Sequence, residues 1–356
     1  MKKLEEIDKN FIVQTKLDID GLVFHNVKDE PFDLYGFHSA TKGEFFKRLP
    51  EEVTKNANPG VQRLNYYPAG CRARFKTNSP YVAISSKYTQ IDRVPQSPFS
   101  GTAGFDMYLL EDGEYVYEKT FIPPADLQPD GFESIHYFRN DGTKDITIYM
   151  PYSNDLVELY IGVADGSELM GGSKYKNQNP IVYYGSSITQ GGCASRSGNI
   201  YENIVSRYFD YDFINLGFSG SAKGEKCLAE YIADMDMCCF VYDYDHNAET
   251  PEDLKATHKP MFDIIRKKNP ELPIILMSAP PCTMWTKEDQ QKRKEVVRET
   301  YNSAIKDGDK NIYFIEGDKM YDIFGGMSGT VDGCHPNDLG FMCMAHHVIE
   351  KMKDIF

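Results

Sequence analysis

The sequence has no long hydrophobic run, no CxxC cysteine pair and only one tryptophan. It contains no stretch of about 18 or more apolar residues, so it predicts no membrane-spanning helix. Basic residues are scarce, with 39 Lys and Arg against 53 Asp and Glu, and the formal net charge is −14. A surface of this sign repels phosphate groups, which argues against nucleic acids and anionic membranes as partners.

The eight cysteines include no CxxC pair, although seven of them fall at or after Cys193. This spacing gives no support for a zinc site, and we expect neither a metal nor a cofactor. Residues 1–13 mix lysines with Glu and Asp where a signal peptide would need an unbroken apolar region. We therefore expect a cytoplasmic protein whose cysteines are reduced thiols.

The length of 356 residues suggests two domains or one large one. In the first half, short β-prone runs alternate with turn signals. The clearest is a hairpin over 104–122 with Asp112-Gly113 at its tip. Further strands are expected at 81–91, 145–152 and 157–163. Regular short strands with few helical patterns predict a β-sandwich or jelly roll.

From about residue 180 apolar strands alternate with amphipathic helices, which predicts an α/β domain with a parallel sheet covered on both faces. The expected strands are 181–185, 213–217, 238–244, 273–278 and 311–317, and the clearest helices are 251–269, 287–306 and 338–355. The Gly- and Ser-rich segment 166–180 is the expected junction. We place an N-terminal domain at 1–172 and a C-terminal domain at 173–356.

Ligands of such sheets bind beyond the carboxyl ends of the strands, so the polar segments there are the place to look for chemistry. Ser187 and Gly220 follow the first and second strands, and Asn247 follows the third. Asp332 and His335 precede the last helix. Each has an ordinary explanation on its own: a helix cap, a glycine turn, an Asx-turn or a loop.

Taken in this order, the four blocks resemble the SGNH (GDSL-like) hydrolase superfamily over residues 180–356. The resemblance implies a flavodoxin-like three-layer domain with a five-stranded parallel sheet. It also implies Ser187 as nucleophile, with His335 and Asp332 completing the catalytic triad. The oxyanion hole would be formed by Ser187, Gly220 and Asn247. One departure is Ser186, where many members carry Asp.

The first half adds a second resemblance. Residues 104–108 read Gly-Phe-Asp-Met-Tyr, similar to the G-x-D-L-Y motif of a β-sandwich domain that precedes one group of SGNH esterases. Met107 replaces the Leu of that motif. The arrangement resembles two-domain carbohydrate esterases, which carry a jelly roll ahead of the catalytic domain.

These resemblances imply a serine esterase that hydrolyses acyl esters, and we expect acetyl esters of sugars or oligosaccharides. Trp285 follows the fourth strand, where it either stacks on a sugar at the rim of the site or packs under the rim. Asp245, His246 and Arg293 are further candidates for substrate contact, although Arg293 also fits a solvated helix face.

Three alternatives remain open. An acyltransferase, or an esterase or thioesterase for a non-carbohydrate acyl group, would share the same residues. A non-catalytic sugar-binding protein would not need Ser187, Asp332 and His335. A metal held by Asp243 and Asp245 with Asp332 and His335 would leave the serine and glycine blocks unexplained. The sequence leaves the oligomeric state open, including a homo-oligomer.

Overall fold

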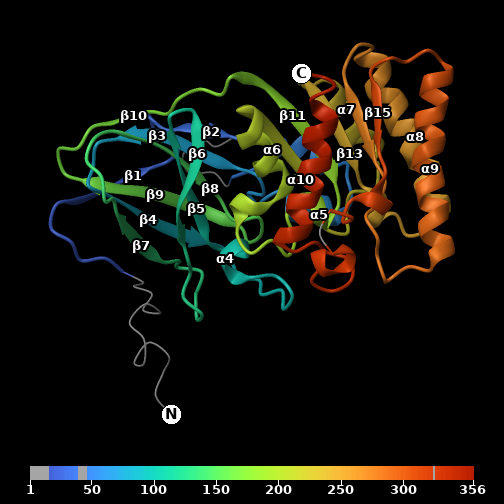
Figure 1. Cartoon of the computed structure of the whole chain (residues 1–356). Coiled ribbons are helices and arrows are strands. Elements are labelled where there is room, and N and C mark those ends of the chain that lie inside the picture. Colours follow the sequence, from blue (N-terminus) through green and yellow to red (C-terminus); the bar gives the residue numbers. More distant parts are fainter. Residues whose placement is uncertain (1–15, 39–45, 324) are drawn as a thin grey trace.

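The computed structural model describes residues 16–38, 46–323 and 325–356. Residues 1–13, on which the expected cellular location depends, lie outside the described residues. Two antiparallel sheets occupy one side of the molecule, and a parallel sheet with its helices occupies the other (Figure 1). In the described part of the chain, no helix combines the length and the apolar character needed to span a membrane.

The N-terminal half is a β-sandwich, as its short strands and turns predict. One sheet has the order β1 (Leu22–Asn26), β9 (Leu156–Ala164), β4 (Tyr81–Tyr88) and β7 (Glu133–Tyr137). The other has the order β10 (Leu169–Gly171), β3 (Arg72–Thr77), β8 (Lys144–Tyr149), β5 (Phe105–Glu111) and β6 (Glu114–Phe121), with β2 (Asp33–Tyr35) also paired to β3. Both sheets contribute to one buried core that includes Phe75, Ile84, Ile148 and Ile161.

The predicted hairpin is present as β5 and β6, which pair from Phe105–Phe121 to Glu111–Glu114. Asp112 and Gly113 form its tip with φ values of 49° and 85°, the left-handed conformation that Asp-Gly turns supply.

The expected junction 166–180 is not only a linker. It contains β10, which pairs with β3, and the start of β11.

The C-terminal half contains the predicted parallel sheet. Its order is β12 (Tyr211–Gly217), β11 (Asn177–Gly185), β13 (Cys239–Asp243), β14 (Ile274–Met277) and β15 (Ile312–Ile315). This is the order of flavodoxin-like folds, in which the first strand of the sheet lies between the second and the third. The carboxyl ends of β12, β11 and β13 are therefore neighbours, since Gly185 pairs with both Gly217 and Asp243.

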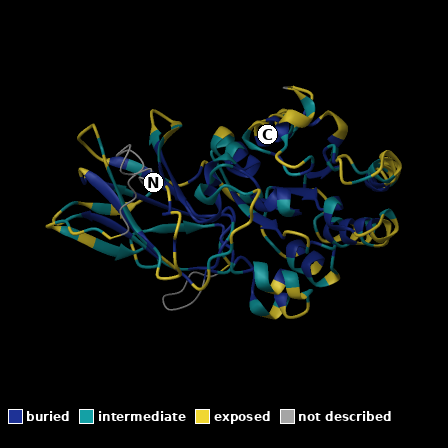
Figure 2. Cartoon of the chain, turned by 90° about the horizontal axis from the view of Figure 1, so that it is seen from below, coloured by how far each residue is buried: buried dark blue, intermediate teal, exposed yellow. Residues whose placement is uncertain are grey.

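Helices cover both faces of this sheet because alternate strand residues face opposite sides. Val182, Tyr184 and Leu276 belong to a core with α7 (Lys226–Ala233), α8 (Pro251–Lys268) and α9 (Lys287–Lys306). Tyr183, Val241 and Met277 belong to a second core with α6 (Tyr201–Phe209) and α10 (Asp338–Met352). Buried residues concentrate in the strands and on the inner sides of the helices (Figure 2).

Two short helices of the first half, α2 (Glu51–Thr54) and α3 (Pro59–Leu64), pack on the second half. Leu49 and Val61 belong to the same core as α7 and α8. The buried Arg48 guanidinium donates hydrogen bonds to the carbonyls of Asn215 and Gly217 at 3.0 and 2.8 Å. The two halves of the chain are therefore joined by intimate packing.

Candidate active site

The turn after β11 presents Ser187 at the first position of the short helix α5 (Ser187–Gln190). The Ser186 side chain accepts a hydrogen bond from Ile188 N–H at 3.2 Å and caps this helix. Gly185 is required by close packing, since a Cβ there would lie 1.9 Å from Thr189 Oγ1 and 2.1 Å from the Asp243 carbonyl. The sequence at this strand end thus fixes a tight strand-to-helix turn with the Ser187 hydroxyl at its start.

Ser187, His335 and Asp332 form a continuous hydrogen-bonded chain. Ser187 Oγ lies 2.9 Å from His335 Nε2, and His335 Nδ1 lies 2.8 Å from Asp332 Oδ2. Both distances lie in the range for hydrogen bonds between a nucleophile, its base and the group that orients the base. The structure therefore brings together three residues that the sequence places in two separate blocks.

The backbone of the same loop fixes the Asp332 carboxylate. Oδ1 accepts hydrogen bonds from the N–H groups of Cys334 at 3.0 Å and His335 at 2.8 Å. Partial burial acts to raise the pKa of Asp332, but the hydrogen bonds from His335 outweigh it and lower that pKa. Asp332 is thus held ionised, in an orientation suited to bind the Nδ1 proton of His335.

Gly220 and Asn247 follow the two strands that flank β11. Gly220 has a φ of +65°, and a Cβ on it would meet nothing within 4 Å. Its N–H donates to no protein acceptor among the described residues. Asn247 ends the 3-10 turn η3 (Asp245–Asn247), and its Nδ2 donates to the Phe218 carbonyl at 2.8 Å. That bond uses one amide hydrogen of Asn247 and ties its loop to the loop that carries Gly220.

The predicted substrate contacts of Asp245 and Arg293 do not agree with their burial. Asp245 is 1% exposed and Arg293 is 3% exposed. Arg293 Nη1 donates to the carbonyls of Asp245 and Ala248 at 2.8 and 2.9 Å, and Asp245 Oδ2 accepts from Ala279 N–H at 2.7 Å. Both side chains hold the loops after β13 and β14, and at 1% and 3% exposure they offer almost no surface to a substrate.

Trp285 is half-buried and contacts other side chains, which favours the second of its two predicted placements. Its ring stacks on His246 with centroids 4.8 Å apart, and the Arg293 guanidinium lies 4.3 Å from its centroid. The His246 side chain is only 5% exposed. His246 is therefore also an interior group, and neither ring is displayed as a free platform for a sugar.

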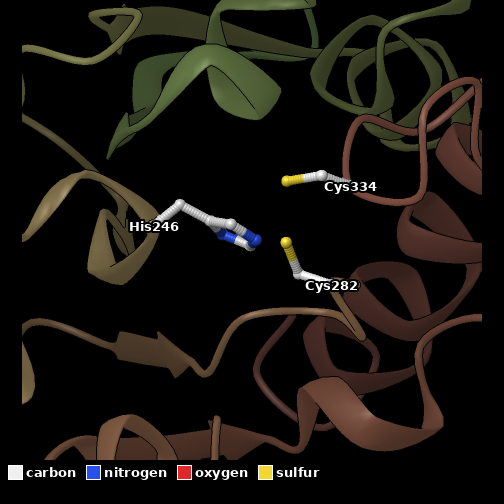
Figure 3. Close-up of side chains that lie close together, drawn as sticks. All are labelled: His246, Cys282 and Cys334. Carbon is white, nitrogen blue, oxygen red and sulfur yellow. The ribbon is translucent and has the colours of Figure 1, made fainter. Parts of the chain in front are cut away.

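Sequence reasoning missed that His246 lies beside two cysteines from distant loops. The side chains of His246, Cys282 and Cys334 point toward one another (Figure 3). A hydrogen bond from Cys334 and the proximity of His246 hold the pKa of the Cys282 thiol below its usual range. Among the described residues, His246, Cys282 and Cys334 are the potential metal ligands that the fold brings together in a group of three. The alternative set with Asp243 and Asp245 is not brought together.

The role of the Gly-Phe-Asp-Met-Tyr motif was also missed. Asp106 is fully buried, and its carboxylate accepts hydrogen bonds from Arg196 Nη1 at 2.9 Å and Gly198 N–H at 2.7 Å. The Tyr108 hydroxyl accepts from Arg196 at 2.8 Å. The motif thus anchors the segment that follows the Ser187 helix, a contact between the two halves that no local pattern reveals.

Two family models match the chain. Residues 178–353 match the GDSL-like lipase/acylhydrolase family, and residues 22–169 match the N-terminus of SGNH-hydrolase-type esterases, named for its GxDLY motif. No curated protein matches the chain.

Solved structures extend this similarity over both halves. A protein from Bacteroides ovatus, described as a candidate GDSL-like lipase, is 30% identical with a TM-score of 0.85 over 94% of this chain and 98% of its own. The salicylyl-acyltransferase of a tetracycline biosynthetic pathway is 18% identical (TM-score 0.77, 95% and 98% covered). A family two carbohydrate esterase from Clostridium thermocellum, solved with cellohexaose, is 15% identical (TM-score 0.58, 81% and 93% covered). The acyltransferase and the carbohydrate esterase, at 18% and 15% identity, show a shared fold and nothing more.

Proposed function

Because the chain belongs to the GDSL-like lipase/acylhydrolase family, we propose that it is a serine esterase that removes acetyl groups from carbohydrates. The observation that carries the proposal is the hydrogen-bonded chain from Ser187 Oγ through His335 to Asp332, with links of 2.9 and 2.8 Å. A nucleophile, a base and an orienting carboxylate in this order are the requirements for acyl transfer through serine.

In the proposed reaction, Ser187 Oγ attacks the ester carbonyl while His335 Nε2 takes the hydroxyl proton. Asp332 accepts a hydrogen bond from the protonated Nδ1 of His335, which orients the ring, and it stabilises the imidazolium that forms. The tetrahedral intermediate collapses as its bond to the sugar oxygen breaks and His335 gives its proton to that oxygen. Water, activated by His335, then hydrolyses the acetyl-enzyme and restores Ser187.

Charge that develops on the carbonyl oxygen needs donors aimed at it. We assign this task to the backbone N–H groups of Ser187 and Gly220 and to the Asn247 side chain. The sheet order supports this assignment because it makes the three loops neighbours. The Gly220 N–H supports it as well, because it donates to no protein acceptor among the described residues. Such donors act strongly because they are held in place before the reaction starts.

The proposal of a carbohydrate substrate is supported by solved carbohydrate esterases that share the fold. A family two carbohydrate esterase that was solved with cellohexaose shares the fold over 81% of this chain. An acetyl xylan esterase from Butyrivibrio proteoclasticus has this fold too. Transfer of the acyl group to an alcohol is the second candidate, because the acyltransferase neighbour covers 95% of this chain with a TM-score of 0.77.

The test measures acetate release from a panel of acetylated sugars and oligosaccharides, with aryl acetates as general ester substrates. Ser187→Ala should lower kcat by at least about four orders of magnitude. Ser221→Ala, which removes a hydroxyl bonded to the Ser219 carbonyl, should retain activity. Substantial turnover by a folded Ser187→Ala protein would refute the triad.

Two further readouts separate the alternatives. A serine-reactive phosphonate should label wild-type protein at Ser187, and absence of labelling would instead support a sugar-binding protein. Added alcohol acceptors distinguish the fate of the acyl group. Hydrolysis predicts free acetate as the main product, whereas preferential formation of the new ester would identify an acyltransferase.

A further inference from the structure

His246, Cys282 and Cys334 form a buried cluster that the proposed reaction does not use. One ligand atom from each lies within 4.8 Å of the other two. His246 comes from the turn after β13, Cys282 from the segment after β14, and Cys334 from the loop before α10. Three loops therefore converge on one point, with the imidazole directed at both sulfur atoms (Figure 3).

Several polar atoms around this point are buried without a nitrogen or oxygen partner within hydrogen-bond distance. Neither ring nitrogen of His246 has a hydrogen-bonded nitrogen or oxygen, and the nearest carboxylate oxygen, Asp245 Oδ1, lies 3.6 Å from Nδ1. Buried polar groups are normally satisfied, so a buried imidazole without a nitrogen or oxygen partner, beside two sulfur atoms, indicates a ligand between them.

We propose that His246, Cys282 and Cys334 bind a zinc ion. Two sulfur ligands and one imidazole suit Zn²⁺ and disfavour Mg²⁺ and Ca²⁺, which prefer oxygen. Three protein ligands leave the fourth tetrahedral position to water or another small ligand. Binding displaces the thiol protons to solvent, so the site gains thiolate ligands as it loses protons.

The surroundings of His246 define which nitrogen binds the ion. Its Nδ1 lies 3.6 Å from Asp245 Oδ1, which leaves Nε2 for the metal. A carboxylate behind a metal-bound histidine fixes its tautomer and makes it a better ligand. The stacked Trp285 ring holds the imidazole plane in the same orientation. Asp245 and Trp285 thus hold the His246 ring in one orientation, and the esterase proposal gives no reason for this arrangement.

The position of Cys334 gives the ion a structural task. Cys334 lies between Asp332 and His335, and its side chain is only 3% exposed. An ion bound by this sulfur and also by His246 and Cys282 would link three loops. It would thereby fix the loop that carries Asp332 and His335. The inference concerns metal binding alone, and it stands whether or not the carbohydrate proposal is correct.

The experiment titrates the reduced, metal-free full chain with Zn²⁺ and counts bound metal after dialysis. We expect one equivalent per chain and a rise in the midpoint of thermal unfolding. Co²⁺ in place of Zn²⁺ should give tetrahedral absorption bands with a sulfur-to-cobalt charge-transfer band. His246→Gln, Cys282→Ser and Cys334→Ser should each lose the stoichiometric metal, and Cys227→Ser, on α7, should keep it.

The outcomes are decisive in both directions. Failure of the reduced wild-type chain to retain metal would overturn the proposal, as would retention by all three ligand variants. If a ligand variant does not fold, the cobalt spectrum of the wild type decides, since absence of the sulfur band excludes the two cysteines as ligands. A disulfide between Cys282 and Cys334 in a protein that binds no metal would instead identify a redox pair. None of these readouts uses esterase activity, so failure of this site and failure of the esterase proposal remain distinguishable.

Discussion

The Asp106 carboxylate accepts a hydrogen bond from the backbone N–H of Gly198 at 2.7 Å. This contact joins strand β5 of the sandwich to the segment between α5 and α6. A Cβ on Gly198 would lie 2.7 Å from Asp106 Oδ2, so the close approach requires glycine. Arg196 supplies a second donor to the same oxygen at 2.9 Å. The sandwich thereby helps to shape the chain that follows the proposed nucleophile.

Removing the Asp106 carboxylate should destabilise the protein. Asp106 is fully buried, and its loss would leave the Gly198 N–H and part of the Arg196 charge unpaired. We expect Asp106→Ala to lower the free energy of unfolding by about 3 kcal/mol, with a smaller loss for Asp106→Asn. Urea denaturation measures the effect. Glu111→Gln, at the exposed end of the same strand, should change stability little, and equal losses in the two variants would contradict the anchoring role.

The second prediction concerns the group that orients His335. Asp332→Asn should lower kcat by about four orders of magnitude, because an amide at this position favours the wrong tautomer of the imidazole. Substrate KM and thermal stability should change much less. Steady-state kinetics with an aryl acetate provide the measurement, and Asp322→Asn, at a nearby exposed position, is the matched control. An Asp332→Asn enzyme within tenfold of wild type would show that Asp332 has no such role.

Asn247 tests the proposed oxyanion hole. Asn247→Ala should reduce kcat by about a hundredfold to a thousandfold, the usual effect of losing one such donor. The variant also loses the hydrogen bond to the Phe218 carbonyl, so kinetics must be measured where both proteins are fully folded. A change confined to KM would identify Asn247 as a substrate-binding residue with no special role in the transition state.

Much of the fold follows from periodicity and turn chemistry. Continuous apolar runs predict β11, β13 and β14 because both faces of a parallel sheet are buried. Asp112-Gly113 fixes the β5–β6 hairpin because its backbone angles require such a pair. The packing of α2 and α3 on the parallel-sheet core could not be predicted, since it depends on contacts distant in sequence. The domain division at 172/173 stays a prediction.

The strand-end rule pointed to the segments that hold the proposed triad residues, and the resemblance to SGNH hydrolases assigned their roles. That rule places a residue near the site without saying which way its side chain points. Arg293 illustrates this, since its guanidinium turns inward onto backbone carbonyls. The cluster of His246, Cys282 and Cys334 had no spacing signal, because each residue comes from a different loop.

The last prediction concerns acid stability. His258 lies in α8 with 1% exposure, and its Nδ1 is 2.8 Å from Thr300 Oγ1 of α9. Burial lowers the pKa of His258 from 6.5 to about 3, so the native protein holds it neutral. Between these two pKa values the unfolded chain binds the extra proton, so the histidine contribution to stability falls as pH falls. Well inside this window the loss is about 1.4 kcal/mol per pH unit.

His258→Gln keeps a hydrogen-bonding group for Thr300 and removes the titration. The variant should be less stable than wild type at pH 7, because it loses the ring packed 4.5 Å from Tyr242. The difference in unfolding free energy should then shrink, and can reverse, as the pH is lowered from 7 to 5. Urea denaturation across this range tests it, with His346→Gln at an exposed position of α10 as the control. Parallel pH profiles for wild type and His258→Gln would show that the ring already ionises freely in the native state.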